Sequence, residues 1–199
     1  MPDSLPPTTR EASRDEAIDK AWVEGAPRHD APITLAEYDP EWPARYAREA
    51  SRITSILGPR VVEIHHTGST AVPGLAAKPI IDIALVVPDS SDESAYADDL
   101  IAAGYRLVIR EPAWFEHRVF KGPDTNINLH VFSPGCQEVP RMVGFRDWLR
   151  THPDDLELYE QTKRDLARQT WAYVQNYADA KTPVVEQIVA RAGGPPRID

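Results

Sequence analysis

Residues 61–87 read VVEIHHTGSTAVPGLAAKPIIDIALVV, and this stretch decides how the chain folds. Its apolar ends, 61–64 and 80–87, predict two buried strands, because nearly unbroken runs of Val, Ile and Leu are typical of strands inside a sheet. Glycine permits close backbone approach, and the N–H groups and hydroxyl of a serine after a strand can hold an anion. We therefore expect a phosphate- or nucleotide-binding corner at Gly68, Ser69 and Thr70. The alternative is that Ser69 or Thr70 caps a short helix.

The second strand of this stretch carries one acidic residue, Asp82. A carboxylate among Ile and Val side chains is costly unless it is paired, solvated or bound to a metal. Asp82 is therefore the strongest single candidate for a functional residue, since a carboxylate beside bound phosphates can hold a cation there. A buried Asp satisfied by backbone donors or by Lys78 is the alternative. The neighbour on the same face is Ala84, where a two-metal site would hold a second acid.

A histidine is expected near Asp82 if the strands are arranged suitably. The segment 125–132, TNINLHVF, predicts the second strand of a hairpin, with Asn128 and His130 on one face. If this strand lies beside the Asp82 strand, His130 points at the same site as metal ligand, base or phosphate donor. A histidine hydrogen-bonded within a half-buried sheet face is an equally good interpretation. His66 shares its facing with Gly68 and is expected to reach the corner.

Basic side chains that can hold phosphate groups occur at several positions. Arginine suits bidentate contacts with phosphate and lysine suits point-charge contacts, although most such residues in any chain are solvated surface. Lys78, close before Asp82, and Arg118, in the hairpin, are the best placed. The full set of candidates is Lys78, Arg118, Lys121, Arg146, Lys163 and Lys181.

The chain divides into one folded domain with an extension at each end. Residues 1–30 are rich in Pro, Asp, Glu, Arg and Ser without apolar periodicity, which predicts a disordered N-terminal extension. Residues 31–192 form the expected domain, and 193–199 a flexible tail. Apolar periodicity predicts an α+β core followed by a helical C-terminal section. Besides those already named, the expected elements are strands at 33–38, 105–110 and 114–121 and helices at 41–57, 89–104, 138–152, 153–178 and 182–193.

The composition argues against several functional classes. The net charge of −9 disfavours broad nucleic-acid or anionic-membrane binding, which needs an excess of basic residues. The single cysteine, Cys136, cannot form an intramolecular disulfide, and the polar N-terminal segment lacks the apolar run of a signal peptide. No window reaches the roughly 18–20 apolar residues of a membrane span. We therefore expect a cytoplasmic protein.

Several segments together resemble the GrpB family over residues 33 to about 192. The family is similar to a divergent branch of the nucleotidyltransferase superfamily, so the resemblance implies a mixed β-sheet core packed by helices. The superfamily pattern is Gly-Ser, a gap of about nine to thirteen residues, then Asp-x-Asp/Glu. Twelve residues separate Ser69 from Asp82, which fits. The segments that carry the resemblance are EYDPEWPARYAREASRI, HTGSTAVPGLAAKPIIDI, NLHVF and FRDWLRTHPDDLELYEQTKRDLA, followed by a lysine before the closing helix.

The resemblance also implies roles for individual residues. Gly68 and Ser69 would contact nucleotide phosphates, and Asp82 would be a ligand of Mg²⁺, with His130 as a second ligand or as the base. Basic side chains would line the same cleft: Arg118, Arg146, Lys163 and Lys181. Two features depart from the superfamily pattern, because Ala84 replaces the second acid and the later strand offers Asn128 and His130 instead of an acid.

Three hypotheses about function stay open at this point. The first is an enzyme that transfers a nucleotidyl or phosphoryl group from a nucleoside triphosphate to a small acceptor. The second is a non-catalytic domain that binds a nucleotide or a phosphorylated metabolite and has lost the acidic metal cluster. The third is a partner domain without a small ligand, because similar domains are fused behind dephospho-coenzyme A kinases. Gly68, Ser69 and Asp82 disfavour the third, whereas Ala84 disfavours the first.

Overall fold

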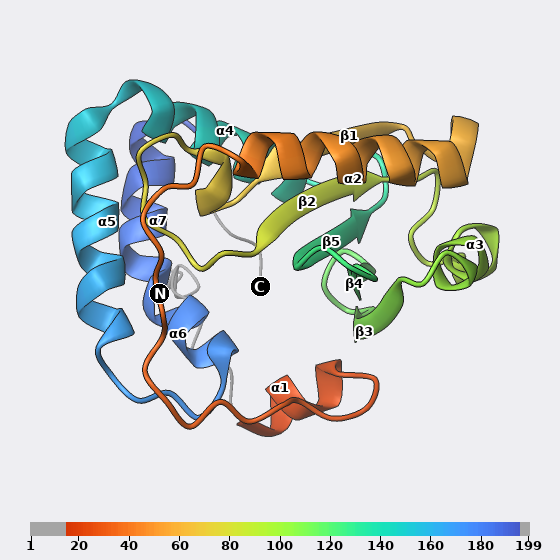
Figure 1. Ribbon diagram of the computed structural model, residues 1–199, viewed down its shortest axis with the longest axis horizontal. Coiled ribbons are helices and arrows are strands. Elements are labelled where there is room, and N and C mark those ends of the chain that lie inside the picture. Colours follow the sequence, from red (N-terminus) through yellow and green to blue (C-terminus); the bar gives the residue numbers. More distant parts are fainter. Residues whose placement is uncertain (1–14, 196–199) are drawn as a thin grey trace, which may run out of the picture.

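The computed structural model describes residues 15–195 and shows an α+β fold, as expected (Figure 1). A mixed sheet lies at the centre, α2 and α3 cover one of its faces, and α4 to α7 form the helical C-terminal section beside it. The α-helices are α1 (Asp15–Ala21), α2 (Trp42–Leu57), α3 (Ala97–Ala102), α4 (Glu138–Thr151), α5 (Pro153–Ala167), α6 (Val174–Ala180) and α7 (Thr182–Arg191). The strands are β1 (Glu63–Thr67), β2 (Ile81–Val86), β3 (Arg106–Glu111), β4 (His117–Lys121) and β5 (Ile127–Phe132), and short 3₁₀ helices are η1 (Gly58–Arg60), η2 (Ser69–Ala71) and η3 (Glu93–Ala95).

The five-stranded sheet has the order β1-β2-β5-β4-β3. The β2 and β5 strands run parallel, and every other neighbouring pair is antiparallel. The register pairs Thr67 and Asn128 with Asp82 on either side of β2, and it pairs His130 with Ala84. Because directly paired residues project to the same face of a sheet, Asp82, Asn128 and His130 share one face.

The opposite face of the sheet carries the main hydrophobic core. Alternate residues of β2 and β5, such as Ile83 and Leu129, are fully buried against Ile53 and Leu57 of α2 and Leu100 of α3. Burying one such side chain contributes about 1.5–3 kcal/mol. The alternation of strand residues therefore fixes which face of the sheet the helices cover, and it leaves Asp82 on the other face.

The crossover between β1 and β2 is held against the C-terminal helices. Val72 and Leu75 of this crossover pack with Leu149 of α4, Tyr159 of α5 and Ile188 of α7 in a second hydrophobic cluster. The segment is thus buried between the sheet and the helices, and its path does not depend on local propensity alone.

Two segments near the N-terminus differ from the sequence-based expectation. Residues 15–30 are not detached, because Ile18 of α1 is buried and the backbone N–H of Val23 donates to Val108 of β3. The segment 33–38 is no strand: Ala36 makes an isolated bridge to Ala77, and the segment runs along the crossover instead of joining the sheet. Residues 1–14 and 196–199, which belong to the expected disordered extension and flexible tail, lie outside the described residues.

The helix expected over 153–178 is interrupted. It ends with α5, and α6 begins after a connection in which Trp171 bridges to Ala31 and its indole donates to the carbonyl of Leu166. A capping box joins Tyr173 to Asn176 and starts α6. Tertiary pairing of Trp171 thus overrides the helical periodicity.

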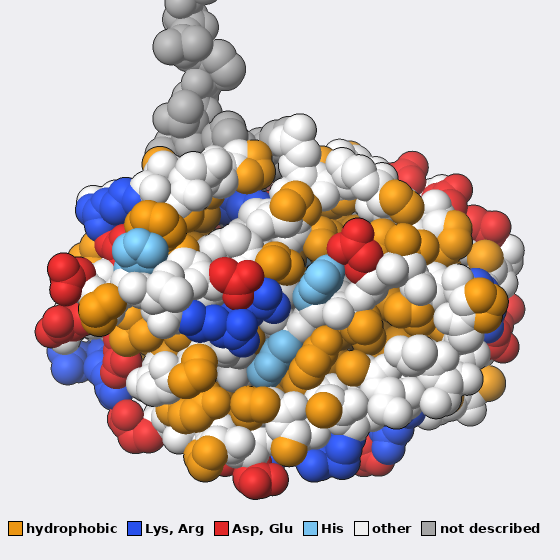
Figure 2. All heavy atoms as spheres, turned by 90° about the horizontal axis from the view of Figure 1, so that it is seen from above, with side chains coloured by type: hydrophobic (Ala, Val, Ile, Leu, Met, Phe, Trp, Pro, Cys, Tyr) orange, Lys and Arg blue, Asp and Glu red, His pale blue; other side chains and the backbone are white. Residues whose placement is uncertain are grey.

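No helix within residues 15–195 has both the length and the apolar character needed to span a membrane. The face seen from above in Figure 1 carries charges of both signs, with histidine side chains among hydrophobic ones (Figure 2). This face therefore has no extended patch of a single charge.

Candidate functional site

The corner after β1 is built around Gly68, whose backbone has φ 67° and ψ −172°. These angles lie in a region that is essentially restricted to glycine. A Cβ atom on Gly68 would lie 2.3 Å from Oδ2 of Asp82, so a side chain at this position would collide with the carboxylate. The structure therefore brings Gly68 and Asp82 together, as the sequence predicts, and only glycine permits the contact.

The two hydroxyl residues after Gly68 serve the corner itself. Ser69 lies near the hydroxyl of Tyr159 in α5: burial raises the pKa of this phenol to about 12, and Ser69 acts against that shift, so the corner faces the C-terminal helices. The hydroxyl of Thr70 is buried, lies 3.1 Å from Nε2 of His66 and donates to the carbonyl of Ile80. Ser69 thus lies at the corner as expected, whereas the hydroxyl of Thr70 is turned inward and supports the corner from behind.

Asp82 lies in a polar network on the face of the sheet that α2 does not cover. The side-chain Nδ2 of Asn128 donates to Oδ1 of Asp82 at 2.7 Å, and Oδ1 of Asn128 accepts a hydrogen bond from Nζ of Lys121 at 2.5 Å. Nε2 of His130 lies 3.8 Å from the same Oδ1. Burial alone raises the pKa of the Asp82 carboxyl, but the interactions with His130, Asn128 and Lys78 outweigh it and hold the pKa below its ordinary value. Asp82 is therefore ionised at neutral pH.

Three lysines from separate elements interact electrostatically with one another: Lys78 of the crossover, Lys163 of α5 and Lys181 between α6 and α7. Lys78 and Lys181 also interact with Asp82. Burial lowers the pKa of Lys163 to about 7 and the pKa of both Lys78 and Lys181 to about 8. The charge of Lys181 further lowers the pKa of the other two, whereas Asp82 raises the pKa of Lys78 and Lys181. We call these three residues the lysine cluster. Lys163 is buried and Lys78 and Lys181 are half-buried, so the cluster brings positive charges together where they are only partly solvated.

Two tyrosines lie within the lysine cluster. Nζ of Lys163 is 5.0 Å from the ring centroid of Tyr159, and Nζ of Lys181 is 4.7 Å from that of Tyr177. Lys163 also donates a hydrogen bond to the carbonyl of Ala76 in the crossover. The hydroxyl of Tyr177 is buried and has no hydrogen-bond partner among residues 15–195. Because an unsatisfied buried hydroxyl costs free energy, it marks a place where a ligand or water can bind.

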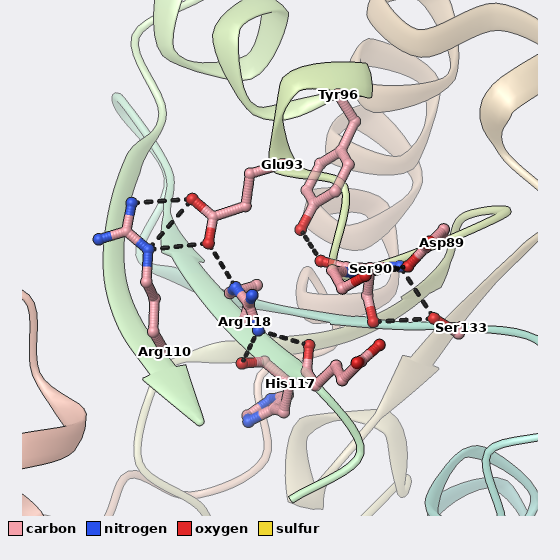
Figure 3. A network of polar contacts seen from close by, with 10 residues as sticks. Asp89, Ser90, Glu93, Tyr96, Arg110, His117, Arg118 and Ser133 are labelled. Atoms are coloured by element: carbon pink, nitrogen blue, oxygen red, sulfur yellow. Dashed lines mark hydrogen bonds and ion pairs between the residues drawn. The ribbon is translucent and has the colours of Figure 1, made fainter. Parts of the chain in front are cut away.

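Arg118 does not join this cluster. Its guanidinium points to the other side of the sheet, where Nε donates to Glu93 at 2.6 Å and Nη1 donates to the carbonyl of Glu116 (Figure 3). Arg110 of β3 binds the same Glu93 carboxylate. Arg118 is paired with Val131, and paired residues project to the same face of a sheet. Because Val131 lies in the hydrophobic core, Arg118 projects to the core face, whereas Asp82 projects to the opposite face. The expectation that Arg118 lines a cleft with Asp82 is therefore corrected by the strand register.

Arg146 and His66 also have structural partners. Nη1 of Arg146 donates to the carbonyl of His66 at 2.7 Å, and Nε of Arg146 donates to Asp147. These contacts dock α4 on the end of β1. The ring of His66 stacks on Tyr46 of α2, with centroids 4.7 Å apart, and so faces the core side of the sheet. His66 does reach the corner, where its Nε2 lies 3.1 Å from the hydroxyl of Thr70, whereas the contacts of Arg146 are with His66 and Asp147 and not with Asp82.

The expected Mg²⁺ site has a single carboxylate. Among residues 15–195, no group of three or more His, Cys, Asp and Glu side chains is arranged to hold a metal ion. Mg²⁺ prefers several oxygen ligands, and the nearby charges of Lys78 and Lys181 repel a cation. The residues present therefore do not fit a resident Mg²⁺ ion. Asp82 acts in this structure as the counter-charge of the lysines.

Two residues of the site, His117 and Glu111, were not among the candidates predicted from the sequence. His117 of β4 is buried, and its Nε2 lies 3.0 Å from Nδ1 of His130, while its Nδ1 lies 2.8 Å from Glu111 of β3. A signal was present in the sequence, because the period of two that places Asn128 and His130 on one face also places His117 and Lys121 on one face. Only the pairing of β4 with β5 shows that the two faces are the same.

Known proteins share this fold and sequence over nearly the whole described chain. A UPF0157 protein of Halalkalibacterium halodurans is 55% identical over 192 residues, which cover 96% of this chain and 97% of that protein. The crystal structure of the conserved protein GrpB from Enterococcus faecalis has a TM-score of 0.70 and 29% sequence identity, and the match covers 80% of this chain and 96% of that chain.

A third relative has a different name and a longer chain. It is a dephospho-CoA kinase of Mycolicibacterium paratuberculosis, 29% identical over 188 residues, and the match covers 81% of this chain but only 46% of that protein. The family model described as GrpB protein matches residues 32–191. The chain therefore belongs to the GrpB family.

Proposed function

We propose that this protein binds the phosphate groups of a nucleotide or phosphorylated metabolite in the cytoplasm, at the corner formed by Gly68 and Ser69. The observation that carries the proposal is the lysine cluster, in which the buried Lys163 and the half-buried Lys78 and Lys181 are brought together from separate elements, and Lys78 and Lys181 interact with Asp82. Burying like charges beside one another is costly unless an opposite charge compensates them. A phosphate chain supplies that charge and accepts hydrogen bonds from each lysine.

The surroundings of the cluster support the same ligand class. The unpartnered hydroxyl of Tyr177 offers a further donor beside Lys181. Gly68 has no side chain, and this lets Oδ2 of Asp82 lie against the corner, so the acid and the corner face the same ligand. Because the lysines themselves compensate the phosphate charge, binding does not require a divalent cation.

Transfer of a nucleotidyl or phosphoryl group is a second candidate function. It is favoured by the pair of Asp82 and His130, whose Oδ1 and Nε2 atoms lie 3.8 Å apart on the exposed side of the site. His130 would take the proton of an attacking hydroxyl group on the acceptor. The relatives named dephospho-CoA kinase make a phosphorylated cofactor such as dephospho-CoA a reasonable ligand to test.

The test is calorimetric titration of inorganic triphosphate, ATP and dephospho-CoA into the protein, with Mg²⁺ and then with EDTA. We expect saturable binding of at least one of them that survives EDTA. Lys181→Met removes one charge-assisted hydrogen bond worth about 1.5–3 kcal/mol, so the affinity falls by at least about tenfold. The exposed Lys20 of α1 provides the matched control, and Lys20→Met leaves the affinity unchanged.

The outcomes separate the hypotheses. Binding that needs Mg²⁺ and disappears with Asp82→Asn points to a metal-bridged nucleotide and contradicts the lysine-held phosphate. No binding of any of the three probes contradicts the proposal as a whole. Release of pyrophosphate or ADP in the presence of small hydroxyl-bearing acceptors supports transfer in addition to binding.

A further inference from the structure

The N-terminal residues of the described chain are fastened to β3, which is an edge strand of the sheet. The backbone N–H of Val23 donates to the carbonyl of Val108 at 3.0 Å, and Trp22 forms an isolated antiparallel bridge with Ile109. The helix that precedes them, α1, contacts β3 and has one buried side chain, Ile18. This end therefore rests on a helix of seven residues and on the short backbone pairing that follows it.

The residues that follow are fastened beside the lysine cluster. The backbone N–H of His29 donates at 2.8 Å to the carbonyl of Ala172, in the connection between α5 and α6. The backbone N–H of Ile33 donates at 2.9 Å to the carbonyl of Ala167, the last residue of α5. Ile33 also packs in one hydrophobic cluster with Ala167 and Tyr177, whose ring lies close to the lysines. Several hydrogen bonds and buried apolar contacts therefore make this end the firmer one.

Residues 22–32 join these two attachments, and we call them the strap. Figure 1 shows α1 and the segment that follows it on the opposite side of the sheet from α2, which is the side of Asp82. From Val23 to His29 an extended chain reaches at most about 21 Å. Crossing from β3 to β2 already takes three strand spacings, or about 14 Å. The strap therefore has little slack and must cross the face of the sheet directly.

The register of the strands shows where the strap starts. Ile109, the partner of Trp22, pairs with Val119 of β4, and Val119 pairs with His130 of β5. The strap thus leaves β3 in the row of the sheet that contains His130, beside Asp82 of the neighbouring strand. The side chains of His130 and Asp82 keep 22% and 28% of their surface exposed, so a ligand can reach them.

The strap has a defined bent shape. Gly25 has φ 80° and Asp30 has φ 49°, and positive φ values of this kind mark places where the chain turns. The carboxylate of Asp30 accepts two hydrogen bonds from Arg28, at 2.8 and 2.6 Å, and the carboxylate of Asp19 accepts one from the N–H of Ala26 at 2.9 Å. A few turn residues of this type can absorb the backbone rotation when a segment opens as a unit.

We propose that the strap opens at its β3 end to admit the ligand and closes over it afterwards. Opening at this end costs the burial of Ile18 and the hydrogen bond of Val23, whereas the attachments beside the lysine cluster stay intact. Segments that open for ligands are drawn from the least stable contacts of a fold. Closure over a ligand rests on the proposed function, but control of the access of small molecules to the lysines does not.

Access to the lysines is measured without any ligand, by brief treatment with acetic anhydride and mass spectrometry of the acetylated peptides. Ile18→Asp places a charge at the buried anchor and so releases α1. We expect Lys78 and Lys181 to be acetylated at least threefold faster in this variant, while the exposed Lys20 reacts at the same rate in both proteins. Equal rates at Lys78 and Lys181 overturn the proposal.

A disulfide across the bridge makes the opposite change, and it answers the question if the first variant does not fold. Trp22→Cys and Ile109→Cys replace the bridged pair, and Cα atoms paired in this way lie about 4.5–5.5 Å apart, which a disulfide can span. Cys136→Ala in the same chain removes the native cysteine. The oxidised protein should be acetylated at Lys78 and Lys181 at least threefold more slowly than the same protein reduced with dithiothreitol. Equal rates in the two states overturn the proposal.

Closure over a ligand is measured by amide hydrogen exchange, with inorganic triphosphate as the probe. Saturating triphosphate should slow the exchange of the Val23 N–H at least tenfold, because a closed strap keeps the hydrogen bond to Val108. The matched control is the N–H of Val62, which donates to Val86 at 2.8 Å at the opposite edge of the sheet and should not be slowed. Equal slowing at both amides, or none at Val23, contradicts closure.

The two proposals fail in different ways. If triphosphate does not bind, the phosphate proposal and closure over it fail together, while the acetylation rates still decide whether the strap controls access to the lysines. If triphosphate binds with the same association rate to the oxidised and the reduced disulfide variant, phosphate binding stands and the strap is not a gate.

Discussion

Oδ2 of Asp82 lies against the backbone of Gly68, where a Cβ atom would be only 2.3 Å away. The carboxylate and the corner therefore form one unit. The corner cannot take another residue without moving Asp82, and Asp82 is in turn held by His130, Asn128 and Lys78. This coupling leads to the first prediction.

Gly68→Ala is expected to lower the free energy of unfolding by about 2–4 kcal/mol. The substitution forces alanine into a backbone conformation that is restricted to glycine, and the new Cβ atom collides with Asp82. Gly74→Ala is the matched control, since Gly74 has φ 81° but no atom within 4 Å of an added Cβ. Its cost should be about 1 kcal/mol. Denaturant unfolding measures both values.

The collision itself is isolated by a double-mutant cycle. Asp82→Ala removes Oδ2, so Gly68→Ala should cost at least about 1 kcal/mol less in that background than in the wild type. Additive effects would show that the backbone conformation alone accounts for the cost, and that the contact with Asp82 is unimportant.

Phosphate binding is expected to be coupled to proton uptake. The pKa of Lys163 is lowered to about 7 and the pKa values of Lys78 and Lys181 to about 8, so part of the cluster is uncharged at pH 8. A bound phosphate anion raises these pKa values, and the complex therefore binds more protons than the free protein. Titration of inorganic triphosphate at pH 8 in two buffers of different ionisation enthalpy should give different heats. Equal heats would mean that the lysines do not face the ligand.

Lys163 should make the free energy of unfolding depend on pH above about 7. Its pKa is about 7 in the folded protein and near its ordinary value of 10.5 when unfolded, so the unfolded state binds more protons between these values. Stability must then rise with pH across this window. Lys163→Met removes this lysine's share of the slope and leaves that of Lys78 and Lys181, so the difference in unfolding free energy between pH 7 and pH 9 should shrink by on the order of 2 kcal/mol. Lys20→Met, which changes an exposed lysine, should leave the slope unaltered.

Glu93 is expected to matter for stability and not for phosphate binding. Its carboxylate is shared by Arg110 and the buried Arg118, and the hydrogen bond from Arg110 is the largest cause that holds the pKa of Glu93 below its ordinary value (Figure 3). Glu93→Gln should destabilise the protein by about 1–3 kcal/mol at pH 7, because it leaves the arginines poorly compensated.

The acid side of the stability profile provides a second readout for Glu93. A carboxyl whose folded pKa is depressed stabilises the fold above its unfolded pKa of about 4.5, and the contribution is lost as the pH falls through the folded pKa. The variant and the wild type should therefore converge in acid. Glu63→Gln, at an exposed partner of His65, is the control with little effect. Weaker triphosphate binding in Glu93→Gln would contradict the placement of Arg118 away from the site.

The sequence predicted the local features of the site well, because they depend on short-range chemistry. The Gly-Ser corner, the isolated acid in an apolar strand and the facing of Asn128 and His130 all follow from residue type and a period of two. Lys78, Lys163 and Lys181 were recognised as candidates, but so were Arg118 and Arg146, and nothing in the sequence separates these two groups. The acidic or carbonyl partner of a basic side chain depends on which segments, distant in the sequence, pack against it in the folded protein.

Strand register and helix packing separate the three lysines that lie together from Arg118 and Arg146, which have other partners. Pairing of β4 with β5 turned Arg118 toward Glu93 and brought His117 to His130, and neither could be derived from β4 alone. Packing of the crossover against α4, α5 and α7 brought Lys163 and Lys181 into electrostatic contact with Lys78. What the sequence by itself determined is therefore the type of the strands β1, β2 and β5 and of most helices, and the face that each side chain takes along them, since both depend on backbone geometry within one segment. Which faces meet, and so which charges share a buried site, was decided only by the tertiary structure, because burial and strand pairing act between residues far apart in the chain.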